Sequence, residues 1–250
     1  MKNLAVHIEQ LTFQYSENSG VYFHEFDLKI KEGDRFGLFG PNGAGKSTLM
    51  NLMTGILQVQ QGHIKLFGKD IQKHPRKEIT SLFGFVPQDF SFYQELSPRE
   101  NLEFYGAWYG LSKKESVEAS EELLAILGLE HVHNKPVALF SGGMKRRINL
   151  AIAVMHKPKL LFLDEPTVGV DVQTRHAIID FLLEMNKKGT TLVYTSHQLS
   201  EAESLCENVA LIDQGKIIAQ DQLSFLCDVY KEDNLEGLFL HLTGKAYRDM

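Results

Sequence analysis

Hydrophobic and polar positions alternate in short stretches over the first forty residues of the chain. Residues 4–15, 21–30 and 34–40 are rich in β-branched and aromatic side chains, and the turn sequences SENSG and KEGD separate them. This pattern predicts three strands. From Lys46 the hydrophobic spacing changes to that of a helix, which we expect to end at Gly55, because glycine is common just past a helix terminus.

Strands and then helices are indicated in the next part of the chain. A strand pair around 62–68 and a strand over 82–88 are expected from their apolar content. A helix start follows, with Ser97 as N-cap, Pro98 at the first helical position and Glu100 at the third.

Two more helices are expected before the chain returns to strands. The sequence SKKE at 112–115 repeats the capping-box spacing, and the helix that it opens should end near Gly128. The stretch FSGGMKRRINLAI at 140–152 opens the third helix. We therefore expect a helical insertion at about 90–155.

The last part of the pattern alternates buried strands with a helix. The apolar run at 158–166 is bounded by prolines and is typical of a central parallel strand that is buried on both faces. A helix over 171–188 should end at Gly189, and the strand 191–197 should also be central. The segment 208–221 is typical of a hairpin. This alternation predicts an α/β fold.

Composition narrows the function. The chain has 250 residues, 43% of them hydrophobic, and a formal net charge of −6. An acidic chain repels polyanions, so we expect no nucleic-acid partner. Cys206 and Cys227 lie outside any metal-binding spacing and indicate reduced thiols in packing positions. The N-terminus lacks the pattern of a signal peptide, and we find no apolar segment long enough to cross a membrane.

The sequence GPNGAGKST follows one expected strand and precedes an expected helix. It fits the phosphate-loop pattern, in which backbone N–H groups at a helix N-terminus face phosphates, a lysine contacts the outer phosphates and a hydroxyl binds Mg²⁺. A chance match has odds of about 1% from glycine's frequency. An ordinary turn is therefore a weak alternative. The predicted nucleotide-binding residues here are Gly40, Asn42, Gly43, Gly45, Lys46, Ser47 and Thr48.

Two carboxylates stand at the end of the strand 158–166, where open α/β sheets bind ligands. We assign Asp164 to the magnesium shell, with Ser47, and Glu165 to the orientation and activation of the attacking water. Acidic turn residues also end many strands. Beside a phosphate loop, the catalytic interpretation is favoured.

The motifs together resemble a known family. GPNGAGKST, Gln88 in FVPQDF, the SGG sequence, LLFLDEP, VGVD and His197 in YTSHQ closely resemble the nucleotide-binding subunits of ATP-binding cassette (ABC) transporters, in the family's order. The resemblance covers residues from about 4 to 220. It implies a P-loop NTPase core with a mostly parallel central sheet, an N-terminal antiparallel β subdomain and the inserted helical subdomain.

The resemblance assigns roles to four further residues. Tyr15 matches the aromatic that stacks on adenine, although it also suits strand packing. Gln88 matches the glutamine that reaches Mg²⁺ and the water. Asp171 matches an aspartate that crosses a dimer interface, while a helix N-cap explains it locally. His197 matches the switch histidine that contacts the γ-phosphate.

The resemblance also explains the SGG sequence. Ser141, Gly142 and Gly143 would point at the γ-phosphate of ATP held by a second copy, so that each nucleotide lies between two chains. A capped helix start without a ligand is the alternative. The family usually has leucine and glutamine where this chain has Phe140 and Met144, and a side-chain hydrogen bond from position 144 is lost. Val170 also replaces a leucine.

Further features point to a branch of the family and to a partner. The sequence MKRR after SGG resembles the drug-exporter branch, as does the region around Gly237, where that branch usually has an acidic residue. Lys145 and Arg147 fit a solvated face or ion pairs. Seven aromatics lie in 89–110, beside the groove that receives the membrane subunit in the family, and core packing should account for about half: Phe90, Phe92, Tyr93, Phe104, Tyr105, Trp108 and Tyr109.

The resemblance implies an ATPase subunit that uses ATP and Mg²⁺, works as a homodimer and powers export through a separate transmembrane permease. It would lie in the cytoplasm, peripheral on the inner face of the membrane. The chain would be one ABC ATPase domain, with a core at about 1–89 and 156–220, the helical subdomain at about 90–155 and a C-terminal helical extension at 221–250.

Two alternatives remain open. A non-transport ABC ATPase acting on DNA or ribosomes usually carries a long coiled coil or two cassettes, whereas only 94 residues separate Lys46 from Ser141 here, without heptads. A nucleotide-binding module without hydrolysis is the other alternative, and the presence of Glu165 argues against it.

Overall fold

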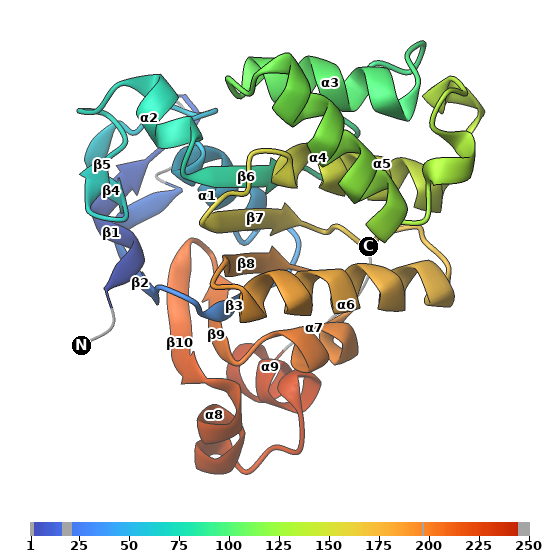
Figure 1. Ribbon diagram of the computed structural model, residues 1–250. Coiled ribbons are helices and arrows are strands. Elements are labelled where there is room, and N and C mark those ends of the chain that lie inside the picture. The colour runs from blue at the N-terminus through green and yellow to red at the C-terminus, as the bar shows by residue number, and fades with distance from the viewer. Residues whose placement is uncertain (1–2, 17–21, 197, 245–250) are drawn as a thin grey trace.

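The computed structural model describes residues 3–16, 22–196 and 198–244. At its centre is a six-stranded sheet in the order β10-β9-β3-β8-β7-β6, parallel except for the β9–β10 hairpin (Figure 1). The buried apolar runs expected at the centre form β7 and β8. The strands are β3 (Arg35–Phe39), β6 (Phe83–Val86), β7 (Leu160–Asp164), β8 (Thr191–Thr195), β9 (Asn208–Asp213) and β10 (Lys216–Gln222).

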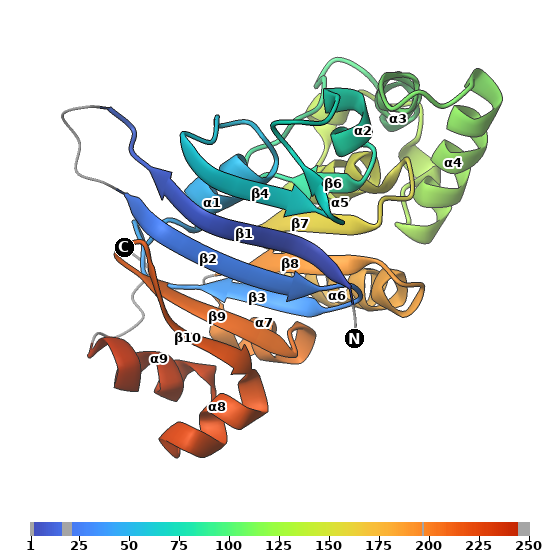
Figure 2. The same cartoon turned by 90° about the vertical axis from the view of Figure 1, so that its left-hand side faces the viewer.

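A second, antiparallel sheet has the order β2-β1-β4-β5 (Figure 2). It is the β subdomain that the family resemblance implied. Its strands are β1 (Leu4–Phe13), β2 (Phe23–Lys31), β4 (Gln61–Leu66) and β5 (Lys69–Asp70). The first helix, α1 (Lys46–Met53), contributes Leu49, Met50, Leu52 and Met53 to the apolar layer between the two sheets. The helix that carries the phosphate-loop lysine is therefore held by both sheets.

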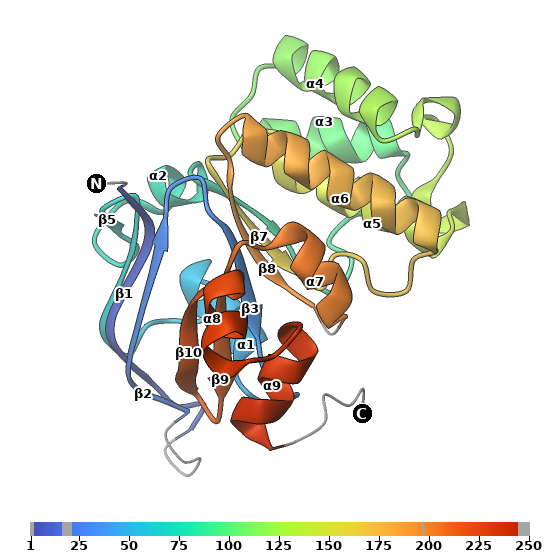
Figure 3. The same cartoon turned by 90° about the horizontal axis from the view of Figure 1, so that it is seen from below.

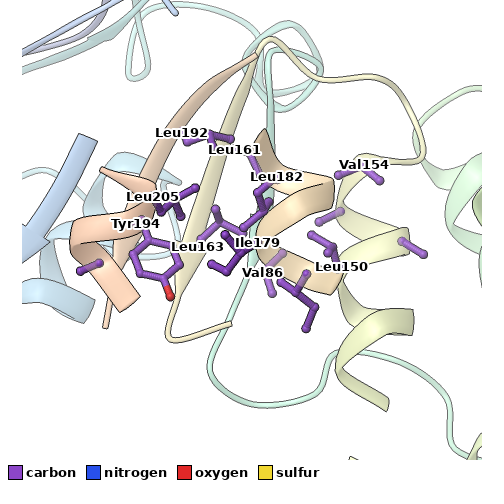
Figure 4. Packing of buried hydrophobic residues seen from close by; sticks show 14 of the residues in the cluster. Val86, Leu150, Val154, Leu161, Leu163, Ile179, Leu182, Leu192, Tyr194 and Leu205 are labelled. Carbon is purple, nitrogen blue, oxygen red and sulfur yellow. The ribbon is translucent and has the colours of Figure 1, made fainter. Parts of the chain in front are cut away.

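Alternate residues of the parallel strands supply two separate hydrophobic cores. Leu160 and Phe162 of β7 face the antiparallel sheet, whereas Leu161 and Leu163 face the helices on the other side. This is the side-chain alternation of a strand that is buried on both faces. In Figure 4, Leu161 lies near Leu182 and Leu163 lies beside Ile179.

The expected helical insertion contains three helices. Helix α6 packs on the face of the parallel sheet that this insertion also covers (Figures 1 and 3). The capping boxes predicted at Ser97 and Ser112 are both present, Ser141 caps the third helix and Asp171 caps α6. These helices begin where the sequence predicted. They are α3 (Pro98–Trp108), α4 (Lys113–Ile126), α5 (Gly142–Val154) and α6 (Val172–Lys187).

The aromatic residues at 89–110 divide into packed and exposed groups. Phe92, Tyr105 and Tyr109 pack against the core of the helical face. Four others are exposed, with Trp108 the most exposed at 77%: Phe90, Tyr93, Phe104 and Trp108. The expectation that packing explains about half of the group is confirmed.

Short helices complete the fold, and several had no sequence prediction. The C-terminal helical extension is α8 (Leu223–Tyr230) and α9 (Leu235–Thr243), as expected. Elements without a prediction are α2 (Arg76–Thr80), α7 (Leu199–Leu205) and the 3₁₀ turns η1 (Glu130–Val132) and η2 (Val137–Leu139). Within the described ranges, every helix is too short or too polar to cross a membrane.

Candidate nucleotide site

The phosphate loop joins the end of β3 to the start of α1 through glycines in special conformations. Gly43 and Gly45 have φ values of 80° and 112°, in the left-handed region that favours glycine. A Cβ atom at Gly45 would lie 2.7 Å from the Phe23 ring, so a side chain there would also collide with the antiparallel sheet. The glycine at this position is required by both conformation and space.

Helix α1 presents its N-terminus to the loop. Its hydrogen-bond ladder starts with the N–H of Leu49 donating to the Gly45 carbonyl at 2.8 Å. The N–H groups of Lys46, Ser47 and Thr48 therefore point out of the helix end, where the helix dipole is positive. This arrangement favours an anion such as a phosphate.

The Lys46 ammonium group is buried in the same loop. Its Nζ donates to the carbonyl oxygens of Gly40 at 2.8 Å and Pro41 at 3.2 Å. Burial lowers the pKa of Lys46, and the negative charges of Glu165 and Asp164 oppose that effect. A phosphate placed here would favour the charged ammonium further, so the site is suited to an anionic ligand.

A cavity of about 600 Å³ lies in front of this helix end. Six of the seven phosphate-loop residues that the sequence predicted line it, together with Gln88 and Glu165. Sequence reasoning did not predict four of its lining residues. The lining is Tyr22, Asn42, Gly43, Gly45, Lys46, Ser47, Thr48, Gln88, Glu165, Val168, Gly169 and Gln198.

Neighbouring side chains orient the two carboxylates at the end of β7. Thr195 of β8 donates its hydroxyl to Asp164 Oδ1 at 2.7 Å. The amide Nε2 of Gln88 donates to Glu165 Oε2 at 3.2 Å. The backbone of Glu165 has a φ of 51°, an unusual conformation for a residue with a side chain. Glu165 is therefore placed toward Gln88 by a strained turn and a cross-loop hydrogen bond.

The donor set near the cavity fits Mg²⁺. Ser47 offers a hydroxyl oxygen, Asp164 a carboxylate and Gln88 an amide oxygen, and Mg²⁺ prefers oxygen ligands. Mg²⁺ also tends to be held by few protein groups together with waters and substrate phosphates. Among the described residues, no three or more His, Cys, Asp or Glu side chains are grouped so as to hold a metal ion.

None of the three SGG residues lines the cavity, although a Cβ atom at Gly142 would lie 3.7 Å from the carbonyl oxygen of Gly169, which does. Ser141 Oγ accepts a hydrogen bond from the Met144 N–H at 3.3 Å, which makes it the α5 N-cap. Such a bond leaves the Ser141 hydroxyl hydrogen able to reach an acceptor beyond the helix. A Cβ atom at Gly143 would lie 3.6 Å from Asp171 Oδ2, so the SGG residues and Asp171 are neighbours. Met144 packs against the helical core.

Asp171 has the local role that the sequence offered as an alternative. Its Oδ1 accepts from the Thr174 N–H at 2.8 Å, and its Oδ2 accepts from the Thr174 hydroxyl at 2.8 Å. These hydrogen bonds lower the pKa of Asp171. The cap is therefore present in one chain, and the contact across a dimer stays a prediction. Lys145 and Arg147 were expected on a solvated face or in ion pairs, and Arg147 instead donates to the Leu127 carbonyl at 2.8 Å.

Tyr15 lies beside the cavity, in contact with two residues that line it. Tyr15 is 57% exposed, and its hydroxyl is 2.6 Å from Thr48 Oγ1. Its ring packs edge-on against Tyr22, which is the aromatic that lines the cavity. Periodicity places both tyrosines at strand ends and cannot rank them. His197 lies outside the described residues.

Comparison with known proteins gives one family. Residues 23–168 match the model for "ABC transporter". The linearmycin resistance ATP-binding protein LnrL of Bacillus subtilis is 43% identical over 220 residues, which are 88% of this chain and 70% of that protein. The Nod factor export ATP-binding protein I of Sinorhizobium fredii is 36% identical over 226 residues, 90% of this chain and 65% of that protein.

Solved structures agree over most of the chain. An ATP-binding subunit of an ABC transporter superimposes with a TM-score of 0.87 at 26% identity, and the match covers 96% of this chain and 99% of that one. A dimeric ATP-binding cassette in a post-hydrolysis state with ADP and phosphate gives a TM-score of 0.78 at 25% identity, covering 87% and 98%. The chain therefore belongs to the ABC transporter family, as an ATP-binding and ATP-hydrolysing domain.

Proposed function

We propose that two copies of this chain close around two Mg-ATP molecules and power a separate transmembrane permease. One observation carries the proposal. The cavity gathers Lys46, Gln88 and Glu165, whereas Ser141 and Gly143 are not among its described lining residues. The exposed α5 N-terminus can therefore serve a nucleotide held by a second copy.

Residues of the proposed site divide into binding and catalytic groups. The N–H groups of the phosphate loop and Lys46 bind the phosphates, and Tyr15 or Tyr22 contacts the adenine. Ser47, Asp164 and Gln88 would hold Mg²⁺, which when bound neutralises charge on the phosphates. Asp164 is kept in place by the Thr195 hydroxyl.

Glu165 would act on the attacking water, assisted by His197 and Gln88. Its carboxylate accepts from the Gln88 amide at one oxygen, Oε2. A carboxylate has further lone pairs, which can accept a proton from a water in the cavity. The SGG residues and Asp171 of the second copy would complete the site and exclude solvent from it.

The transport role rests on the relatives and on one surface. Relatives named for drug resistance and for Nod factor export support an exporter. The exposed Phe90, Tyr93, Phe104 and Trp108 form an aromatic surface on the helical insertion, the docking surface, which we propose contacts the permease. The chain would then be peripheral on the cytoplasmic face of the membrane. The net charge of −6 disfavours a nucleic-acid partner.

The proposed domain division follows from these roles. The core at about 1–89 and 156–220 would bind the nucleotide, and the helical subdomain at about 90–155 would carry both the SGG residues and the docking surface. The extension at 221–250 would pack on the core, where Leu226, Leu235 and Leu238 join the helical-face cluster.

Replacing Glu165 tests the two-chain site. Glu165→Gln keeps the shape of the side chain but cannot take a proton, so ATP should bind while hydrolysis falls by about 100-fold or more. Because hydrolysis no longer separates the two copies that enclose ATP, ATP and Mg²⁺ should shift the variant from monomer to dimer in size-exclusion chromatography with light scattering. The exposed Glu118→Gln is the matched control and should retain turnover.

A second variant tests the contribution of the SGG residues. Ser141→Arg in the Glu165→Gln background places a bulky cation at the helix end and should abolish the dimer, while a fluorescent ATP analogue still binds. If Glu165→Gln binds ATP and its molar mass never doubles, the proposal that two copies enclose the nucleotide is wrong.

A further inference from the structure

Helix α5 buries two polar side chains on the face that meets the loop carrying Gln88. Arg146 is 5% exposed and Asn149 is 1% exposed. Placing a guanidinium and an amide in the interior is costly unless each makes hydrogen bonds. Their partners therefore show what the two residues hold in place.

Arg146 contacts the loops on both sides of the catalytic carboxylate. Its Nη1 donates to the carbonyl of Gln88 at 2.7 Å and of Pro87 at 3.3 Å, and its Nη2 donates to the carbonyl of Val168 at 3.5 Å. The guanidinium also lies 5.0 Å from the centre of the Phe90 ring. One planar group thus joins the Gln88 loop to the segment that follows Glu165.

Asn149 holds the same loop one turn further along α5. Its Oδ1 accepts from the Ser91 N–H at 3.2 Å and from the Ser91 hydroxyl at 2.9 Å. Its Nδ2 donates to the Pro87 carbonyl at 3.3 Å. Gln88 therefore lies between two points at which α5 grips the 87–91 loop.

The same helix begins at the SGG residues. Arg146 is five positions after Ser141, a rise of about 7.5 Å along the helix. A regular helix of this length moves as a unit, so a displacement of its N-terminus reaches the carbonyls of Gln88 and Val168 through side chains without an intervening flexible segment. The Gln88 amide in turn contacts Glu165.

We propose that Arg146, with Asn149, is a positioning residue that couples the SGG helix end to Gln88 and Glu165 of the same chain. This rests on the proposed two-copy site. When the α5 N-terminus closes on the nucleotide of the second copy, the hydrogen bonds of Arg146 and Asn149 to the 87–91 loop, here called the clamp, place Gln88 for hydrolysis in the cavity of its own chain. Each half-site thereby controls the other.

A double-mutant cycle between Arg146 and Gln88 tests the coupling. Arg146→Met keeps much of the side-chain length but removes the three hydrogen bonds to the Pro87, Gln88 and Val168 carbonyls. It should lower kcat by about 10- to 100-fold through misplacement of Gln88, with KM for ATP changed by less than about 3-fold. Arg146→Lys retains the charge without the planar fork and should recover only part of kcat. In a Gln88→Ala background, Arg146→Met should change kcat by less than about 2-fold.

The adjacent arginine is the matched control. Arg147 is on the same helix but donates to the Leu127 carbonyl, away from the site. Arg147→Met should lower the melting temperature and leave kcat per folded molecule within about 2-fold. If Arg146→Met does not fold, Asn149→Ala replaces it in the same cycle.

The outcomes separate this inference from the proposed function. The coupling is overturned if Arg146→Met lowers kcat by the same factor with and without Gln88→Ala, or if Arg146→Met leaves kcat unchanged in the parent chain. The Glu165→Gln dimer decides the two-copy site independently. If the Glu165→Gln dimer forms and the cycle is additive, only the clamp is wrong.

Discussion

A partly buried histidine shows how an individual residue links packing to the pH dependence of stability. His156 follows α5, and its Nε2 is 3.0 Å from the Phe83 carbonyl oxygen, so this nitrogen carries the hydrogen in the bonded tautomer. Its ring stacks on Tyr109 at a centroid distance of 3.9 Å. Burial lowers the pKa of His156 from 6.5 to about 4, although the hydrogen bond to the Phe83 carbonyl opposes the effect. The folded chain therefore holds this histidine neutral.

Stability should fall on acidification because of His156. The unfolded chain takes up a proton near pH 6.5, whereas the folded chain resists it until about pH 4. The contribution is present above pH 6.5 and is lost as pH falls toward 4, by about 3 kcal/mol. Urea unfolding between pH 7 and 4 measures it. The free energy of unfolding of His156→Phe should depend less steeply on pH than that of the parent, whatever its absolute value. An identical slope of this free energy against pH would contradict this account.

At the scale of the element, helix starts are local chemistry. Ser112 accepts from the Glu115 N–H at 3.3 Å, and Glu115 Oε2 accepts from the Ser112 N–H at 2.8 Å. Both partners lie within four residues, which is why the sequence alone predicted them. The same holds for the caps of α3, α5 and α6.

Removing the α4 cap should have a small, measurable cost. Ser112→Ala loses the side-chain acceptor, so the free energy of unfolding should fall by about 1 kcal/mol. For a chain of this size, the melting temperature should drop by about 2–4 °C. Ser112→Asp keeps an acceptor at the cap and should stay near the parent in differential scanning calorimetry. Equal melting temperatures for the alanine and aspartate variants would refute a role for the cap.

Elements and contacts that depend on distant residues were not predicted. Helix α7 has seven residues and no side-chain cap, so no local signal marks its start at Leu199. The sequence placed Arg146 in a cationic stretch, whereas its carbonyl partner at Gln88 is 58 positions away. Tyr22 lines the cavity because of the tertiary packing of the antiparallel sheet, which the local sequence does not show. The phosphate loop and the strand-end carboxylates were predictable because their spacing itself defines the chemistry.

For the whole molecule, packing within one chain does not account for the exposed aromatic residues of the docking surface. Trp108 is exposed on α3, and Phe104 lies one turn before it. Large exposed aromatics on a folded domain are typical of a partner surface.

Loss of Trp108 should separate membrane association from ATP hydrolysis. Trp108→Ser should reduce the fraction of the chain that sediments with native membranes several-fold, because aromatic anchors dominate interface energies. Its melting temperature and basal ATPase rate should match the parent. Phe225→Ser, an exposed aromatic on α8, is the control and should leave sedimentation unchanged. Equal loss in both variants would exclude a specific docking role for Trp108.

The left-handed backbone of Glu165 also affects how this chain can evolve or be engineered. That conformation costs glutamate on the order of 1 kcal/mol, and asparagine tolerates it better. Asparagine at this position would therefore relieve strain while removing the carboxylate. Selection for thermal resistance alone would drive the chain toward a nucleotide-binding scaffold without turnover, and only selection for turnover retains the glutamate.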